Sequence, residues 1–161
     1  MDHRRVVVTS VEEMNKVAAE VAVDLQAGQI LLLYGELGAG KTTFVQGLAK
    51  ALGITDRVTS PTFVIASEYT VPSHSSIHTL VHIDLYRLEE GAAVADPAVQ
   101  DALSRASDPH LRSSTGSGGQ AGRLTVIEWA DRLGEHAPKT AQRISFSHAK
   151  SPTERLLTFL Q

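Results

Sequence analysis

The sequence predicts an α/β fold in which a mostly parallel central sheet carries helices on both faces and antiparallel hairpins are added to it. Three observations favour this class. The run 30–33 is apolar at every position, which is typical of a strand covered on both faces in a parallel sheet. Segments with helical periodicity alternate with strand patterns along the chain. Short strand patterns joined by turns, at 63–85 and 143–160, predict the hairpins.

Composition limits the classes of function. The 161 residues predict a single domain, 1–161, and no apolar run approaches the roughly 20 residues that span a bilayer, so no membrane contact is expected. The chain has no cysteine, which excludes disulfides, thiolate metal sites and a cysteine nucleophile and fits a cytoplasmic protein. A net charge of −3 argues against an autonomous nucleic-acid binder, so any contact with RNA is expected to be indirect or weak.

The N-terminal part of the chain predicts a strand, a helix and a second strand. Residues 6–9 can form a short strand. Ser10 followed by Glu13 forms a capping-box pattern, and apolar residues at helical spacing continue to Gln26. Gly28 fits the end of this helix, and the apolar strand 30–33 follows.

A phosphate-binding loop follows that strand directly. Residues 35–42 read G-E-L-G-A-G-K-T and match the pattern G-x-x-x-x-G-K-[ST], with a predicted helix over 41–52. The backbone N–H groups of 37–42 are expected to surround the β-phosphate of a nucleotide, helped by the positive end of the helix. Lys41 is expected to bridge the β- and γ-phosphates and to lie outside the core, and the Thr42 hydroxyl to complete the shell of Mg²⁺. The alternative is a glycine-rich turn that caps a helix, with Lys41 exposed.

The rest of the chain predicts mainly strands. Residues 63–71 and 79–85 are expected to pair as an antiparallel hairpin around the turn 72–76. A weak helical pattern over 89–111 is broken by Pro97 and Pro109. The Ser/Gly-rich segment 112–123 is interpreted as a flexible surface loop. A strand over 124–129 follows, and residues 143–148 and 156–160 complete the chain as a hairpin.

Two of these strands end in an acid. Asp84 closes L-V-H-I-D, and Glu128 closes L-T-V-I-E. Acids at the carboxyl ends of parallel strands lie in the crevice where such sheets bind ligands. We therefore expect Asp84 and Glu128 to hold Mg²⁺ or to orient an attacking water, with Lys41 as the third catalytic group. The alternative for each acid is a helix cap or a pair with an arginine.

Other residues near these motifs have two interpretations each. Ser60-Pro61-Thr62 lies where related folds sense the γ-phosphate, but a proline turn with locally satisfied hydroxyls explains it equally well. Trp129 fills the core or stacks at the edge of the nucleotide site. His82 is a satisfied strand histidine or faces the same side as Asp84. The predicted nucleotide-binding set is Glu36, Leu37, Gly38, Ala39, Gly40, Lys41, Thr42, Thr43, Thr62 and Trp129.

Taken together, four blocks resemble the TsaE family, formerly called YjeE. They are G-E-L-G-A-G-K-T-T-F at 35–44, S-P-T-F at 60–63, H-I-D-L-Y-R-L at 82–88 and I-E-W at 127–129. The resemblance implies a P-loop NTPase fold and the ATPase subunit of the bacterial machinery that makes threonylcarbamoyladenosine in tRNA, next to the anticodon. It implies that 37–42 bind ATP and that Thr42 and Glu128 hold Mg²⁺. Asp84 would be a required acid near the γ-phosphate.

The resemblance also implies partner proteins. Family members bind a heterodimer of two related proteins, TsaB and TsaD, and ATP hydrolysis is thought to reset that complex between turnovers. The chain departs from the family pattern in two places. The segment after Leu88 is rich in alanine instead of acidic, and Ala130-Asp131 stands where proline usually follows Trp129. Neither change touches the phosphate or metal positions.

Two other functions stay open on the sequence. A small-molecule or nucleoside kinase shares the loop and the order of elements, and Arg105, Arg112 and Arg123 could then belong to a lid over the phosphates. A nucleotide-loaded interaction module would bind ATP without a functional need for hydrolysis. The oligomeric state and the residues that contact adenine are not indicated by any pattern.

Overall fold

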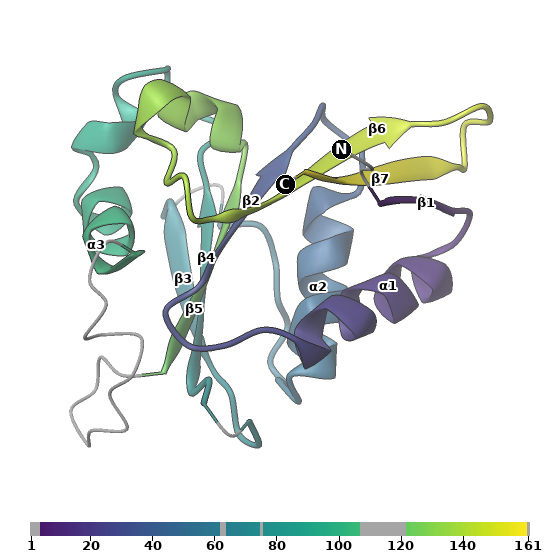
Figure 1. The fold of residues 1–161 in the computed structure, drawn as a ribbon, viewed down its shortest axis with the longest axis horizontal. Coiled ribbons are helices and arrows are strands. Elements are labelled where there is room, and N and C mark those ends of the chain that lie inside the picture. Colours follow the sequence, from purple (N-terminus) through teal and green to yellow (C-terminus); the bar gives the residue numbers. More distant parts are fainter. Residues whose placement is uncertain (1–3, 62–63, 75, 107–121, 161) are drawn as a thin grey trace.

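Seven strands form one sheet in the order β1-β7-β6-β2-β5-β4-β3 (Figure 1). The structure is a computed structural model and describes residues 4–61, 64–74, 76–106 and 122–160. The strands are β1 (Arg5–Val8), β2 (Ile30–Tyr34), β3 (Ala66–Thr70), β4 (Thr79–Asp84), β5 (Arg123–Glu128), β6 (Gln142–His148) and β7 (Arg155–Leu160).

The centre of the sheet is parallel and both edges are antiparallel. β2 pairs in parallel with β5 and β6, and β5 pairs in parallel with β4. β3 is antiparallel to β4, β7 to β6, and β1 to β7. The predicted α/β class, with its parallel core and added hairpins, is confirmed.

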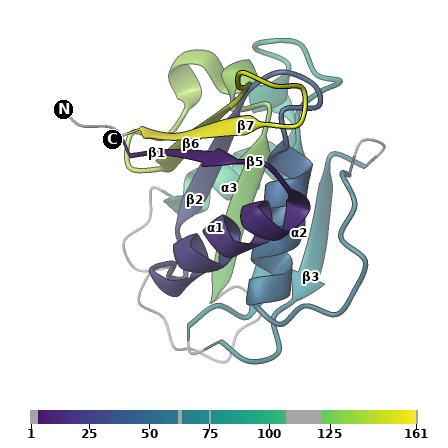
Figure 2. The same ribbon diagram turned by 90° about the vertical axis from the view of Figure 1, so that its right-hand side faces the viewer.

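Helices cover both faces of the sheet. α1 (Val11–Val23) and α2 (Lys41–Ala51) pack together on one face, which is turned toward the viewer in Figure 2. The other face carries α3 (Pro97–Ala106) and the short 3₁₀ helices η1 (Ala93–Ala95) and η2 (Ala130–His136). Alternate residues of β2 enter the two cores: Leu31 and Leu33 pack on the α1–α2 side, and Ile30 and Leu32 on the other. Because β2 is covered on both faces, residues 30–33 are apolar at successive positions.

The start of α1 follows the predicted cap with one difference. Ser10 has extended backbone angles and its hydroxyl accepts from the Glu13 N–H at 3.2 Å. The Glu13 carboxylate, however, accepts from the backbone N–H and hydroxyl of Thr9, one residue before the cap. The helix ends at Val23, not at Gln26, because the N–H groups of Asp24 and Leu25 bond to carbonyls three residues back and tighten the last turn.

The start of β3 differs from expectation. β3 begins at Ala66, and the expected strand start at 63–65 is wrong for Val64 and Ile65. Val64 N–H bonds to Pro61 O, and Ile65 has a left-handed φ of 62°, so the chain turns there. Ile65 O accepts from the Asp84 N–H at 2.9 Å, and regular pairing with β4 begins at Ala66. Phe63 lies outside the described residues.

The weak helical pattern over 89–111 resolves into η1 and α3. Pro97 is the first residue of α3, where its missing N–H is no loss, and the Asp96 carboxylate accepts from Ala98 N–H at 2.9 Å. Pro109 and residues 112–121 of the predicted flexible loop lie outside the described residues, and Arg123 already belongs to β5. Within the described ranges no helix has the length and apolar character that crossing a membrane requires.

Candidate functional site

The predicted phosphate loop joins β2 to α2 at the carboxyl end of the central strand. Gly40 caps α2 with a φ of 102°, and Gly38 has a φ of 76°. Residues with a side chain rarely adopt these backbone conformations. Gly35 has a φ of 138°, and a Cβ there would lie 2.3 Å from the Phe146 carbonyl oxygen of β6. Glycine is therefore required where the loop passes the neighbouring strand.

Lys41 is buried, which corrects the prediction that it lies outside the core. Its side chain is 4% exposed, and Nζ donates to the carbonyl oxygens of Gly35 at 2.5 Å and Glu36 at 2.9 Å. The ammonium also lies 4.0 Å from the ring centroid of Trp129, a cation–π contact. The sequence pattern could not show this contact, because Trp129 follows β5 and is distant from Lys41 along the chain.

Burial lowers the pKa of Lys41 below its ordinary value of 10.5, because the ammonium loses hydration. Glu128, Asp84 and Asp131 oppose this shift by favouring the charged form. An additional anion in front of the loop would favour the ammonium in the same way.

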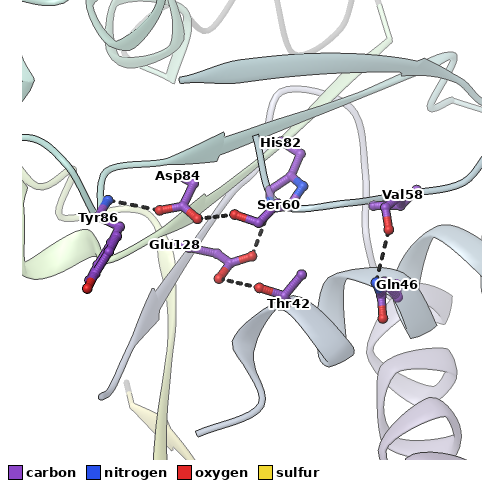
Figure 3. A network of polar contacts seen from close by, with 8 residues as sticks. All are labelled: Thr42, Gln46, Val58, Ser60, His82, Asp84, Tyr86 and Glu128. Atoms are coloured by element: carbon purple, nitrogen blue, oxygen red, sulfur yellow. Dashed lines mark hydrogen bonds and ion pairs between the residues drawn. The ribbon is translucent and has the colours of Figure 1, made fainter. Parts of the chain in front are cut away.

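The structure brings Asp84 and Glu128 together at the carboxyl ends of two adjacent parallel strands. They are partners in the β4–β5 register, and both side chains are buried. Thr42, in the first turn of α2, donates its hydroxyl to Glu128 Oε2 at 2.9 Å (Figure 3). Thr42 and Glu128 are 86 residues apart in the sequence. The start of α2 and the end of β5 therefore meet through the two side chains that the sequence predicts as metal ligands.

Asp84 holds the segment that follows α2. Its Oδ2 accepts a short hydrogen bond from the Ser60 hydroxyl, and its Oδ1 accepts from the backbone N–H of Tyr86 at 2.8 Å (Figure 3). Gln46 of α2 donates to Val58 O at 3.0 Å and fixes the chain that leads to Ser60. Ser60 thus reaches the site, whereas Thr62 lies outside the described residues.

Glu128 has a further partner in His82. The two side chains are 0% and 2% exposed, and His82 Nε2 lies 2.8 Å from Glu128 Oε1. His82 therefore faces the acids, which agrees with the interpretation that it lies on the same side of its strand as Asp84.

Aromatic rings cover one side of the loop. Trp129 leaves β5 with a left-handed φ of 57°, and its ring lies 4.9 Å from that of Tyr86. Because a tryptophan in this region of backbone space is strained, the surrounding contacts must fix it there. Tyr86 belongs to the block 82–88 that carries the family resemblance, but the sequence analysis assigns it no role.

A cavity of about 330 Å³ joins these groups. It is lined by Leu37, Gly38, Ala39, Gly40, Lys41, Thr42, Thr43, Ser60, Asp84, Tyr86, Glu128 and Trp129. Of the predicted set, Glu36 is exposed and does not line this cavity, although its carbonyl holds Lys41.

A second cavity of about 330 Å³ lies against the same loop, and sequence reasoning missed it. It shares Gly38, Gly40 and Thr43 with the first cavity. Its other walls come from residues 8–11, Met14, Pro152, Thr153 and Arg155. Arg155 Nε donates to Gly38 O at 3.0 Å and ties the β6–β7 turn to the loop. The sequence carries no signal for this wall, because it depends on how the terminal hairpin folds back.

The described arginine of the suggested lid lies elsewhere. Arg123 begins β5, at the end of the strand opposite Glu128, and its guanidinium pairs with Glu68 and Asp101. It cannot close over the loop without leaving the sheet. Arg112 and the Arg105 side chain lie outside the described part of the chain.

The comparisons with known proteins agree with the geometry. Residues 8–157 match the family described as "Threonylcarbamoyl adenosine biosynthesis protein TsaE". The "tRNA threonylcarbamoyladenosine biosynthesis protein TsaE" of Streptomyces coelicolor is 49% identical over 87% of this chain and 82% of its own length. The protein of the same name from Bacillus subtilis is 34% identical over 92% and 79%. A crystal structure of Bacillus subtilis YdiB superposes with a TM-score of 0.69 at 28% identity, covering 98% of this chain and 84% of that one.

Proposed function

The chain belongs to the TsaE family of threonylcarbamoyl adenosine biosynthesis proteins, and from that premise we propose that it is a Mg²⁺-dependent ATPase of the cytoplasm. It would bind the complex that forms the threonylcarbamoyl modification of adenosine in tRNA, next to the anticodon, and reset that complex between turnovers. The single observation that carries the proposal is the contact of Thr42 with Glu128 in front of a glycine loop that also buries Lys41. This arrangement suits a triphosphate with a bound metal ion.

The donor atoms fit Mg²⁺ bound together with a nucleotide. Thr42, Glu128 and Asp84 supply only oxygen, which Mg²⁺ prefers. Among the described residues no group of three or more His, Cys, Asp or Glu side chains could hold a metal ion alone. Mg²⁺ typically takes one or two carboxylates and completes its shell with water and substrate phosphates. When bound, it would neutralise charge on the phosphates.

The protein groups have separable roles. The backbone N–H groups at the start of α2 and the Lys41 ammonium would bind the β- and γ-phosphates. Glu128 and Thr42 would orient the metal ion. Asp84 would orient the attacking water or the metal shell, but both of its oxygens are engaged by Ser60 and Tyr86. Release of the Ser60 contact would leave Oδ2 more open to that water, and we expect the chain alone to turn over slowly.

The second cavity is suited to the nucleoside end of ATP. It adjoins the phosphate loop through Gly38 and Gly40, and its walls combine the apolar side chains of Val11 and Met14 with hydroxyls and Arg155. An apolar wall with a few polar groups is typical of sites for ring-containing ligands. The two cavities together would hold a nucleotide across the loop.

A partner at the mouth of the first cavity would supply what the chain lacks. Leu37 and Tyr86 line that cavity and are 70% and 42% exposed, so these two large side chains are open to a partner. They would supply part of the apolar contact with a partner protein. The TsaB–TsaD heterodimer is the partner that the family resemblance implies, and contact with tRNA is expected to be indirect or weak.

The test measures inorganic phosphate released from Mg²⁺-ATP by the chain alone and with the TsaB–TsaD heterodimer. We expect slow release alone and faster release with the heterodimer. Asp84→Asn should retain ATP binding and lose phosphate release, whereas Asp24→Asn, at the end of α1, should change neither. Transfer of the phosphate to a small molecule would instead identify a kinase, and loss of both binding and release in Asp84→Asn would give Asp84 a structural role.

A further inference from the structure

We propose that His82 is a positioning residue, which holds one oxygen of Glu128 so that the other is presented to Thr42 and to the metal ion. The inference rests on the proposed function, because it concerns the metal site assigned there. It adds a residue that touches neither nucleotide nor metal ion and acts only through Glu128.

The geometry divides the Glu128 carboxylate between two donors. Oε1 lies 2.8 Å from His82 Nε2, and Oε2 accepts from the Thr42 hydroxyl at 2.9 Å. His82 lies on β4 and Glu128 on the adjacent β5, so two rigid strands set the first of these distances. The second crosses to α2, the element that begins in the phosphate loop.

Hydrogen-bond chemistry fixes the direction of the histidine contact. A carboxylate only accepts, so the proton must lie on Nε2. His82 is 0% exposed, and its Nδ1 has no hydrogen-bond partner among the described residues. A ring protonated on Nε2 leaves only a lone pair at the buried Nδ1. A ring protonated on Nδ1 would instead bury an N–H without a partner and would leave Glu128 Oε1 without a donor.

Loss of the donor would free the carboxylate to rotate. Glu128 is 2% exposed, so water would not readily replace the His82 N–H at Oε1. Oε1 and Oε2 would then compete for the Thr42 hydroxyl. Groups that hydrogen-bond to a metal-binding side chain typically change metal affinity roughly 10- to 100-fold when they are removed.

The experiment titrates Mg²⁺ against binding of a non-hydrolysable ATP analogue. In His82→Leu we expect the Mg²⁺ concentration at half-saturation to rise roughly 10- to 100-fold, while binding of the analogue without Mg²⁺ stays as in the unmodified chain. His82→Gln, whose amide nitrogen can donate from a similar distance, should recover most of the loss. Thr125→Val removes a buried polar group from β5 outside this network and should leave the titration unchanged.

The outcomes separate this inference from the metal site itself. Glu128→Ala should also raise the Mg²⁺ requirement. If it does and His82→Leu does not, His82 is not a positioning residue. If neither the unmodified chain nor Glu128→Ala shows a Mg²⁺ effect, the metal site fails and the inference fails with it.

A second measurement needs no variant that might misfold. Nitrogen NMR of the unmodified, nucleotide-free chain with labelled histidine reports the ring tautomer. We expect the signature of a ring protonated on Nε2 for His82. A ring protonated on Nδ1 would overturn the proposal.

Discussion

The Lys41 ammonium lies inside the phosphate loop. The group donates to two loop carbonyls and lies against the face of Trp129. A buried ammonium without a matching anion is unfavourable, and its neighbours Glu128 and Asp84 offset this only in part, since the pKa of Lys41 is still lowered. Under the proposed function, this ammonium would bind the phosphates of the nucleotide.

The first prediction replaces this cation. Lys41→Met keeps an unbranched apolar stem beside Trp129 and should leave the fold intact. We expect ATP binding to weaken roughly 100-fold or more, because each hydrogen bond to a charged group contributes about 1.5–3 kcal/mol. Isothermal titration calorimetry would measure the affinity. Lys50→Met, an exposed lysine of the same helix, is the matched control and should bind normally.

The second prediction concerns pH. The native pKa of Lys41 lies below the unfolded value near 10.5, so between the two values the unfolded chain binds more protons than the native chain. The free energy of unfolding then rises with pH through this window. Urea unfolding of the nucleotide-free chain should show its stability increasing relative to that of Lys41→Met as pH rises from neutral toward 10.5. A difference that stays flat or falls would contradict the assigned burial.

At the scale of elements, the unit formed by β2, the loop and α2 depends on close approach to β6. Gly35 has no room for a side chain beside Phe146, whereas a Cβ on Gly38 would meet nothing within 4 Å. Both glycines have positive φ values, of 138° and 76°. The pair therefore separates backbone strain from steric contact.

The third prediction uses that pair. Gly38→Ala should lower the free energy of unfolding by about 1–2 kcal/mol, the penalty of a left-handed residue. Gly35→Ala should lower it further, by about 1–3 kcal/mol for backbone strain and about 1–3 kcal/mol for the clash. Urea unfolding without nucleotide measures both. Equal losses would mean that β6 moves away at no cost.

At the scale of the whole molecule, the site joins segments that are far apart in the sequence. The loop, the acids of β4 and β5, and Arg155 of β7 belong to one sheet and its covering helices, so a ligand bound there contacts much of the parallel core. Binding to the native state alone must then stabilise the entire fold.

The fourth prediction measures this coupling. At roughly 100-fold excess over its Kd, Mg²⁺-ATP should add about 2.7 kcal/mol to the free energy of unfolding. For a chain of this size each kcal/mol raises Tm by about 2–4 °C, so thermal unfolding should shift upward by about 5–11 °C. Lys41→Met at the same nucleotide concentration should show much less of this shift. An equal shift in both proteins would place nucleotide binding elsewhere.

Much of the fold could be predicted because local patterns encode it. The apolar run of β2, the Ser10 cap of α1 and the glycine pattern of the loop are local signals, and the structure follows each of them. The predictions failed where the backbone departs from its pattern. Ile65 adopts a left-handed turn inside a strand-like run.

The sequence by itself determined the α/β class, the phosphate loop and the two strand-end acids, because each depends on residues close together in the chain. Only the tertiary structure decided that Lys41 is buried against Trp129, that His82 contacts Glu128 and that Arg155 contacts Gly38. These contacts depend on strand order and register. The pairing of β4 with β5 and of β6 with β2 places side chains from distant segments within hydrogen-bond distance. The spacing of residues along the chain does not indicate which strands pair.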